Sequence, residues 1–365
     1  VIHIAGTNGK GSTAAFLKEI LEGHGLSVNI YTSPHLISFN ERIRINKKLI
    51  SDKNLIKILE EVELKNNHNP ITFFEITTAA AFIAFKRFPA DINIFETGLG
   101  GRLDATNIIE NKKLTIITKI GFDHEEFLGN NIQKIAKEKA GILRKNIPVI
   151  IAKQSRGKAR KTLMYKAKEL NSKVIKIDKI SKDTKLGLTG DFQYDNASTA
   201  FTAAKFIIPS ISLTKVKKGL ARTSWFGRIQ KLNDGKIFNL RKNITIIDGS
   251  HNQDGAVVIE KYLTKEALGK WNLIIGMLNN REVKDFVKIF KNHINRIYAI
   301  EIPEQKNSLS ALDIKNKLDD LGFNTNISNS LEIALQKADK KTPLLITGSL
   351  YSAGYALKFN ETIIN

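Results

Sequence analysis

The sequence predicts an α/β fold of two domains. The first is expected to be a phosphate-loop-type ATPase domain with a mainly parallel sheet, and the second a smaller, Rossmann-like α/β domain. Short apolar runs alternate with amphipathic stretches along the chain, which is typical of parallel strands connected by helices. With 365 residues, of which 42% are hydrophobic, the chain is long enough to bury two cores.

The first domain is expected to span residues 1–223. An apolar run at 2–5 predicts a strand, and the segment 13–22 places its apolar side chains on one helical face. Glycines at positions 23 and 25 end that helix. The same alternation then predicts strands at 28–31, 92–95, 114–118 and 148–151, helices at 76–85, 132–142 and 196–208, and a lysine-rich helix after the strand at 148–151.

A hinge is expected at residues 224–228, before a second domain at 229–365. Apolar runs and amphipathic stretches alternate again in this part of the chain, and both domains have an ordinary size. The predicted strands are 244–247, 273–275, 296–299 and 344–347, and the predicted helices are 255–263 and 283–290.

Composition narrows the classes of partner. The chain carries 57 Lys and Arg against 36 Asp and Glu, which gives a formal net charge of +21. These basic residues recur in every segment, so we expect no nucleic-acid partner, and the charge suits an anionic small substrate equally well. No stretch resembles a membrane span or a signal peptide, so we expect a cytoplasmic protein with no membrane partner. We also expect a monomer. The absence of cysteine excludes disulfides and thiolate zinc sites.

A phosphate-binding loop is predicted directly after the first strand. Glycines there permit a tight turn that points backbone N–H groups and the start of a helix at one anion. Lys10 is expected to neutralise the β/γ-phosphates, and Ser12 or Thr13 to bind Mg²⁺. Gly11 separates Lys10 from Ser12, so the loop departs from the usual G-x-x-x-x-G-K-[ST] spacing and is a compact variant. The predicted ATP-binding residues of this loop are Gly6, Thr7, Asn8, Gly9, Lys10, Gly11, Ser12 and Thr13.

Further candidate residues follow other strands of the predicted sheet. Glu96 lies at the carboxyl end of the strand expected at 92–95, where a metal-binding acid is expected. Arg102 and Asp104 follow in a glycine-rich stretch that we interpret as a groove rather than a solvated loop. His124 also follows a strand; its position fits a ligand for a second metal and a structural histidine equally well. Lys139 looks like part of a solvated, charged helix face, although a lysine near a metal can become a carbamate.

With these segments in place, the chain strongly resembles the folylpolyglutamate synthase/dihydrofolate synthase family of Mur-ligase-like amide-forming enzymes. The matching stretches run in family order from residue 5 to 351, and two of them are long and specific to the folate branch. They are AGTNGKGST, YTSPHLISFNERIRIN, FFEITTAAAF, ETGLGGRLDATN, IGFDHEEFLG, IAKEKAGI, WFGRI, DGSHN and TGSLY.

This resemblance implies an ATP-dependent ligase that joins L-glutamate to a carboxylate of dihydropteroate or a reduced folate. The substrate carboxylate would attack the γ-phosphate to form an acyl phosphate, and the glutamate amine would then displace phosphate. Catalysis would consist mainly of positioning and charge neutralisation. Two alternatives stay open: a Mur-type ligase acting on a peptidoglycan precursor, and a truncated, inactive nucleotide-binding homologue.

The resemblance also implies residue roles. It implies that Ser12, Ser33 and Glu96 hold one Mg²⁺, that His124 and Glu96 hold a second, and that Lys139 is carbamylated. With Lys10, these make Glu96, His124 and Lys139 the expected catalytic residues. The substrate-binding residues it implies are Arg42, Arg102 and Asp104, and the additional nucleotide contacts are Asn196, Arg228, Asp248 and His251.

Three features depart from the family pattern. Family members usually carry a helical segment before the first strand, whereas this sequence starts at that strand and without Met, so we expect an effect on dihydropteroate binding. Phe192 stands where histidine is common. Phe226 precedes the glycine of the hinge where proline is usual, which is expected to loosen it.

Overall fold

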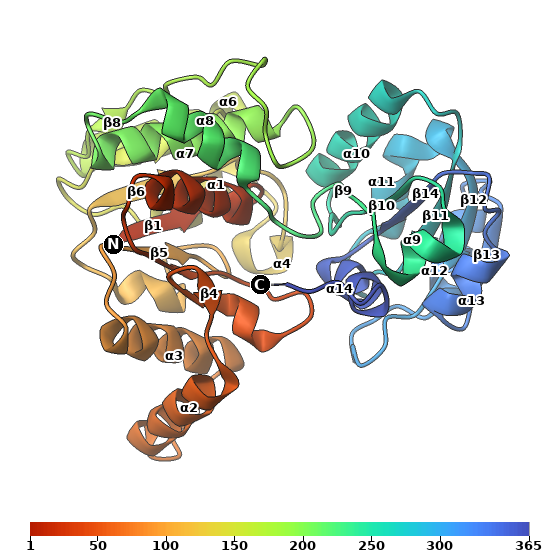
Figure 1. The fold of residues 1–365 in the computed structure, drawn as a ribbon, viewed down its shortest axis with the longest axis horizontal. Helices are drawn as coiled ribbons and strands as arrows, with labels where there is room; N and C mark the ends of the chain where they lie inside the picture. The colour runs from red at the N-terminus through yellow and green to blue at the C-terminus, as the bar shows by residue number, and fades with distance from the viewer. Residues whose placement is uncertain (365) are drawn as a thin grey trace. The chain divides into compact units, whose positions relative to one another are not determined.

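The structure, a computed structural model, describes residues 1–364, which divide into two compact units (Figure 1). The first unit comprises Val1–Gly187 and Asp191–Trp225, and the second comprises Leu188–Gly190 and Phe226–Ile364. The main division falls after Trp225, within the segment 224–228. The role of that segment as a hinge stays a prediction.

The first unit is built on an eight-stranded sheet with the order β4-β3-β2-β5-β1-β6-β7-β8. All neighbours from β2 to β8 pair in parallel, and only the β2–β3 and β3–β4 pairs are antiparallel. The strands are β1 (Ile2–Ala5), β2 (Val28–Tyr31), β3 (Ile43–Ile45), β4 (Lys48–Leu49), β5 (Ile92–Glu96), β6 (Leu114–Ile117), β7 (Val149–Ile151) and β8 (Val174–Ile175).

Helices cover both faces of this sheet. Helix α1 packs against α7 and α8 on one face, and α2 and α3 lie on the opposite side (Figure 1). The helices are α1 (Lys10–Gly23), α2 (Asp52–Asn66), α3 (Phe73–Arg87), α4 (Glu125–Leu128), α5 (Ile132–Ala140), α6 (Gly157–Glu169), α7 (Gln193–Ile207) and α8 (Leu213–Arg222), with 3-10 turns η1 (Phe39–Arg42) and η2 (Ala105–Ile108).

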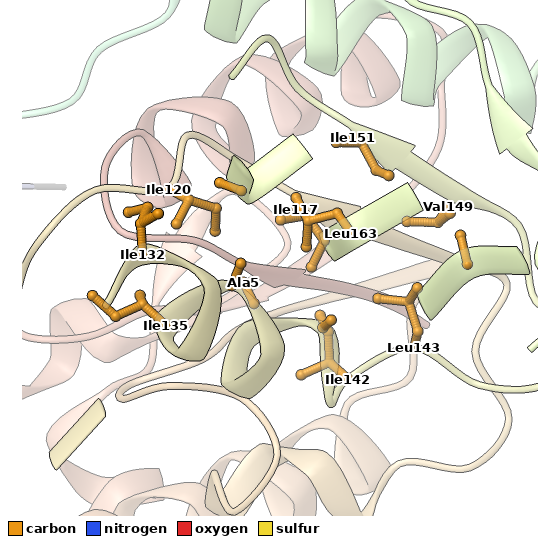
Figure 2. Packing of buried hydrophobic residues seen from close by; sticks show 14 of the residues in the cluster. Ala5, Ile117, Ile120, Ile132, Ile135, Ile142, Leu143, Val149, Ile151 and Leu163 are labelled. Carbon is orange, nitrogen blue, oxygen red and sulfur yellow. The ribbon is translucent and has the colours of Figure 1, made fainter. Parts of the chain in front are cut away.

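The face opposite α1 packs against two helix pairs. Side chains alternate across a strand, so residues in register share a face. Tyr31 and Phe95 are in register and pack with α2 and α3, whereas Ala5 and Ile117 pack with α5 and α6 (Figure 2). Helix α5 is thereby fixed beside the strand that leads into the predicted phosphate loop.

The second unit has a six-stranded sheet with the order β13-β12-β11-β14-β10-β9, in which only β9 is antiparallel to its neighbour. The strands are β9 (Gln230–Lys231), β10 (Thr245–Ile247), β11 (Trp271–Ile275), β12 (Ile294–Ala299), β13 (Thr325–Ile327) and β14 (Leu344–Thr347). The helices are α9 (Gly235–Arg241), α10 (Gln253–Glu266), α11 (Val283–Val287), α12 (Ala311–Asp319), α13 (Leu331–Lys337) and α14 (Leu350–Phe359), with the 3-10 turn η3 (Lys288–His293).

The predicted α/β class with two mainly parallel sheets is confirmed. Most expected elements shift by one to three residues at their ends. The clearest difference is at 283–290, where the α-helix ends at Val287 and a 3-10 turn follows, within which Phe290 leaves the helical region (φ −110°, ψ 22°). Among residues 1–364, no helix combines the length and apolar character that crossing a membrane requires.

Candidate functional site

Four loops carrying predicted site residues leave the same edge of the first sheet. The strands β2, β5, β1 and β6 are adjacent and parallel, so their carboxyl ends lie side by side. Ser33 follows β2, Glu96 ends β5, the glycine-rich loop follows β1, and His124 lies beyond β6. In open α/β sheets, this edge is where ligands bind.

The glycine-rich loop presents the start of α1 as an anion site. Gly9 precedes the helix in the left-handed region (φ 90°), and the first helical hydrogen bond runs from Thr13 N to Gly9 O. The N–H groups of residues 9–12 therefore have no partner within the helix, and no side chain caps them. A phosphate placed there would accept from these groups and gain from the helix dipole.

Thr7 and Asn8, although predicted to bind ATP, use their backbone N–H groups within the protein. The backbone N–H groups of Thr7 and Asn8 both donate to Lys119 O, at 2.9 and 3.2 Å. Thr7 Oγ1 also donates to Gly121 O at 3.1 Å. These bonds attach the loop to the chain after β6, so the amides of Thr7 and Asn8 are already used, and residues 9–12 supply the free donors.

Lys10 and Glu96 form an ion pair at the centre of this edge. Lys10 Nζ lies 3.7 Å from Glu96 Oε1, and the Glu96 side chain is only 6% exposed. Glu96 is the last residue of β5, which pairs directly with β1. The sheet thus holds a carboxylate beside the lysine that follows β1, in a place with little solvent screening.

Lys139 is buried beneath the loop. It lies on the face of α5 that packs on the sheet, and its Nζ donates to Gly6 O at 3.1 Å. Burial, followed by repulsion from Lys10, lowers the pKa of Lys139 from 10.5 to about 7. The solvated helix face expected from residue types alone is therefore wrong for Lys139, although Lys137 on the same helix is exposed.

The predicted metal ligands supply oxygen and imidazole donors rather than a complete cage. Within residues 1–364, no group of three or more His, Cys, Asp or Glu side chains could hold a metal ion. Ser12 is buried, Ser33 is half-buried, and His124 adopts a left-handed conformation (φ 52°) before α4. The oxygen donors of Ser12, Ser33 and Glu96 suit Mg²⁺, which binds through one or two protein carboxylates and completes its shell with water and substrate phosphates.

Asp104 organises the glycine-rich stretch after β5. Its Oδ1 accepts from the N–H and the hydroxyl of Thr106, at 3.0 and 2.6 Å, and its Oδ2 accepts from Leu99 N at 2.8 Å. Arg102, by contrast, is largely exposed and donates to Glu138 at 3.1 Å. Asp104 is therefore fixed in place, whereas Arg102 extends toward solvent.

Arg42 lies in an aromatic setting that residue patterns did not reveal. Its Nε donates to His35 Nδ1 at 2.9 Å, and its guanidinium carbon lies 5.7 Å from the ring centre of Phe39 and 5.4 Å from that of Phe73. Arg42 itself is 6% exposed. Phe39 and Phe73 lie in the family-matching stretches YTSPHLISFNERIRIN and FFEITTAAAF. That match is the only sequence signal that could have identified them as neighbours of Arg42.

Asn196 and Trp225 pack on the phosphate loop from the first unit. A Cβ on Gly9 would lie 2.4 Å from Asn196 Oδ1, and a Cβ on Gly11 would lie 2.7 Å from Trp225 Nε1. Both positions thus have to be glycine for the loop to lie this close to its neighbours. The family resemblance implies a nucleotide contact for Asn196, which stays a prediction, whereas Trp225 was expected only as part of the hinge.

The remaining predicted nucleotide contacts belong to the second unit. Asp248 is buried and its carboxylate accepts from Ile229 N and Ser250 N, both at 2.9 Å. His251 Nδ1 lies 3.2 Å from Gly249 O, and Arg228 is half-buried. Asp248 thus organises the chain after β10, and the nucleotide-binding roles of these residues stay predictions.

Comparison with known proteins agrees with this arrangement. Residues 4–214 match the Mur ligase middle domain family. The dihydrofolate synthase/folylpolyglutamate synthase of Bacillus subtilis is 30% identical, over 96% of this chain and 87% of that protein. The structure of E. coli FolC in complex with DHPP and ADP superposes with a TM-score of 0.87 at 25% identity, covering 98% of this chain and 87% of that one.

A second solved structure is similar to the same extent. The bifunctional folylpolyglutamate synthase/dihydrofolate synthase of Yersinia pestis, complexed with AMPPNP and Mn ion, gives a TM-score of 0.86 at 26% identity over 98% of this chain and 88% of that one. Family, fold and the order of the site loops therefore agree. The chain belongs to the folylpolyglutamate synthase/dihydrofolate synthase family, with a Mur ligase middle domain.

Proposed function

We propose that this protein is an ATP-dependent ligase that joins L-glutamate to a folate-type carboxylate and releases ADP and phosphate. The observation that carries the proposal is the placement of Lys10, Glu96 and buried Lys139 around one phosphate loop. Relatives with this activity in their names cover nearly the whole chain, and solved relatives hold ADP or AMPPNP. No feature of the site favours a peptidoglycan substrate.

In the first step, a carboxylate oxygen of the folate-type substrate attacks the γ-phosphorus of ATP, and the bond to the departing ADP breaks. Four backbone N–H groups at residues 9–12 and the Lys10 ammonium fix and neutralise the phosphates. Glu96, 3.7 Å from Lys10 Nζ, orients that ammonium. The product of this step is an acyl phosphate.

In the second step, the amine of L-glutamate attacks the acyl carbon. The bond to phosphate breaks, an amide forms and a proton is released. The chain contributes mainly by holding the reacting groups in a geometry that favours attack, as in other phosphoryl-transfer enzymes.

A divalent metal belongs to this reaction, because a family member has been solved with AMPPNP and Mn ion. Mg²⁺ bound with ATP would neutralise charge on the phosphate oxygens. We propose two ions, the first held by Ser12, Ser33 and Glu96, and the second by Glu96 and His124. We further propose that Lys139 is carbamylated, which its neutral form at physiological pH would favour.

The substrate side is assigned to the loops after β2 and β5. We propose that Arg42, Arg102 and Asp104 contact the folate-type substrate, and that the protein acts as a cytoplasmic monomer on ATP, L-glutamate and a folate or dihydropteroate. The buried setting of Arg42 beside two phenylalanine rings supports a fixed role for its guanidinium.

The test is ADP release by the purified protein. ADP should form only when ATP, Mg²⁺, L-glutamate and either dihydropteroate or a tetrahydrofolate are all present. Omission of each component in turn supplies the controls. ADP release that does not depend on glutamate would contradict the proposal.

A further inference from the structure

A buried chain of hydrogen bonds joins the first strand to the glycine-rich loop. His3 lies in β1 and has no exposed surface, and its Nε2 is 2.7 Å from Thr106 Oγ1. Thr106 is equally buried, and its hydroxyl lies 2.6 Å from Asp104 Oδ1. Asp104 Oδ2 accepts from Leu99 N at 2.8 Å, which closes the loop.

The direction of each bond follows from the chemistry of the three side chains. A threonine hydroxyl has one proton, and here it is donated to the carboxylate of Asp104. The hydroxyl oxygen must then accept from His3, so Nε2 carries the proton of the imidazole. Burial and the nearby charges of Lys112 and Arg144 lower the pKa of His3 well below 6.5, so the ring is neutral.

A neutral ring protonated on Nε2 leaves Nδ1 as a bare acceptor. Among residues 1–364, His3 Nδ1 is buried and has no hydrogen-bond partner. Burying Nδ1 without a partner costs free energy. The bond from Nε2 to Thr106 Oγ1 is the favourable polar contact that offsets part of this cost. A hydrophobic residue would fill this core position at lower cost, which indicates that the Nε2–H donor is what the position requires.

The two carboxylate oxygens of Asp104 differ in the number of further hydrogen bonds that they can accept. Oδ1 already accepts two donors from Thr106, whereas Oδ2 accepts one, from Leu99. A carboxylate oxygen has two lone-pair sites, so Oδ2 keeps one acceptor position. The orientation of that position depends on Oδ1 being held by Thr106, which in turn is held by His3.

We propose that His3 and Thr106 are positioning residues that orient Asp104 Oδ2 to accept a hydrogen bond from an N–H group of the folate-type substrate. The proposal rests on the proposed function and extends it to two residues that touch neither ATP nor the reacting carboxylate. It assigns them to recognition of the substrate rather than to phosphoryl transfer.

The test compares Thr106→Val with Thr106→Ser. Valine keeps the shape and removes the hydroxyl, so we expect the KM for tetrahydrofolate or dihydropteroate to rise about tenfold, the usual effect of one hydrogen bond to a charged group. The kcat and the affinity for ATP should change by less than about twofold, and serine should restore the KM. Thr106→Ala replaces valine if that variant does not fold.

His3 is tested in the same assay. His3→Leu should raise the KM in the same direction, and His3→Gln, which keeps an N–H donor, should restore part of it. The double variant His3→Leu/Thr106→Val should be no worse than Thr106→Val, because both changes break one chain of bonds. Thr202→Val is the matched control, since Thr202 is a buried threonine whose hydroxyl donates to Ser198 O at 2.7 Å within α7.

If the wild type is active and Thr106→Val leaves the KM for tetrahydrofolate or dihydropteroate unchanged, the positioning role is wrong. Parallel loss of ATP affinity would also overturn it, because it would indicate general damage to the sheet edge. If the wild type makes no glutamate product, the proposed function fails separately. Equilibrium dialysis with tetrahydrofolate then decides the positioning role, with binding weakened in Thr106→Val expected and equal binding contradicting it.

Discussion

We expect removal of CO₂ to inactivate the enzyme, and replacement of Lys139 to do the same, because each change prevents formation of a carbamate on Lys139. Lys139 is 5% exposed, and its Nζ donates to Gly6 O at 3.1 Å, directly below the phosphate loop. Only a neutral amine can attack CO₂, releasing a proton as the carbamate forms. The reactivity of this side chain therefore depends on how far its pKa is lowered.

The magnitude follows from the pKa of about 7, compared with 10.5 for an unperturbed lysine. At pH 7 about half of Lys139 is neutral, whereas roughly one in three thousand ordinary lysines would be, so the reactive form is enriched about a thousandfold. Between about pH 8 and pH 6 the neutral fraction of Lys139 falls roughly tenfold. Activity limited by carbamate formation should fall with it as the pH drops.

The assay is ADP release in CO₂-depleted and bicarbonate-supplemented buffers across this pH range. Lys139→Ala should be inactive and should be partly rescued by an added short carboxylic acid, which supplies the missing carboxylate. Lys137→Ala, on the exposed side of the same helix, is the control and should keep its activity. Full activity of Lys139→Ala, or no effect of CO₂ together with no rescue, would show that activity does not depend on a carbamate at Lys139.

The remaining predictions concern the loop, one buried cation and one glycine. Lys10→Ala and Glu96→Ala should each lower ADP release by at least about a hundredfold, whereas His24→Ala, at the far end of α1, should leave it unchanged; normal rates in Glu96→Ala would contradict the metal assignment. Lys112 has a pKa lowered to about 7, mainly by burial, so the unfolded chain binds more protons above that pH and Lys112 should add about 1.4 kcal/mol per pH unit to the rise in stability up to about pH 10. Urea unfolding at several pH values should show a slope smaller by about that amount in Lys112→Met than in the wild type, and equal slopes would show that Lys112 is not the cause. Gly141→Ala should cost about 1–3 kcal/mol in thermal unfolding, because its Cβ would lie 2.5 Å from a backbone Cα of the facing loop; an unchanged Tm would show that the loop yields freely.

Strand and loop order could be predicted from the sequence because apolar runs and glycines are local signals. The strands at 2–5, 28–31 and 92–95 and the loop after the first of them emerge directly from the pattern. The antiparallel edge β3–β4 was not predicted, because strands of three and two residues are too short to show an alternation. Helix α2 was not predicted either, although its buried residues Leu55, Ile58 and Val62 recur at helical spacing.

The chemistry of individual side chains depended on packing that residue types do not carry. Lys139 and Lys137 are alike in sequence, yet one faces the core and the other faces solvent. The amides of Thr7 and Asn8 donate to Lys119 O and so are not available to a phosphate. This could not be predicted from the sequence, because it depends on a contact between the loops after β1 and β6. The bond from His3 to Thr106 joins residues 103 positions apart, beyond any local pattern.

The most direct test of the central claim is product analysis with dihydropteroate and a tetrahydrofolate offered side by side, together with ATP, Mg²⁺ and L-glutamate. We expect a glutamylated pteridine product formed with one ADP for each amide bond, and no product in Lys10→Ala. ATP binding without a glutamylated product from either substrate would contradict it.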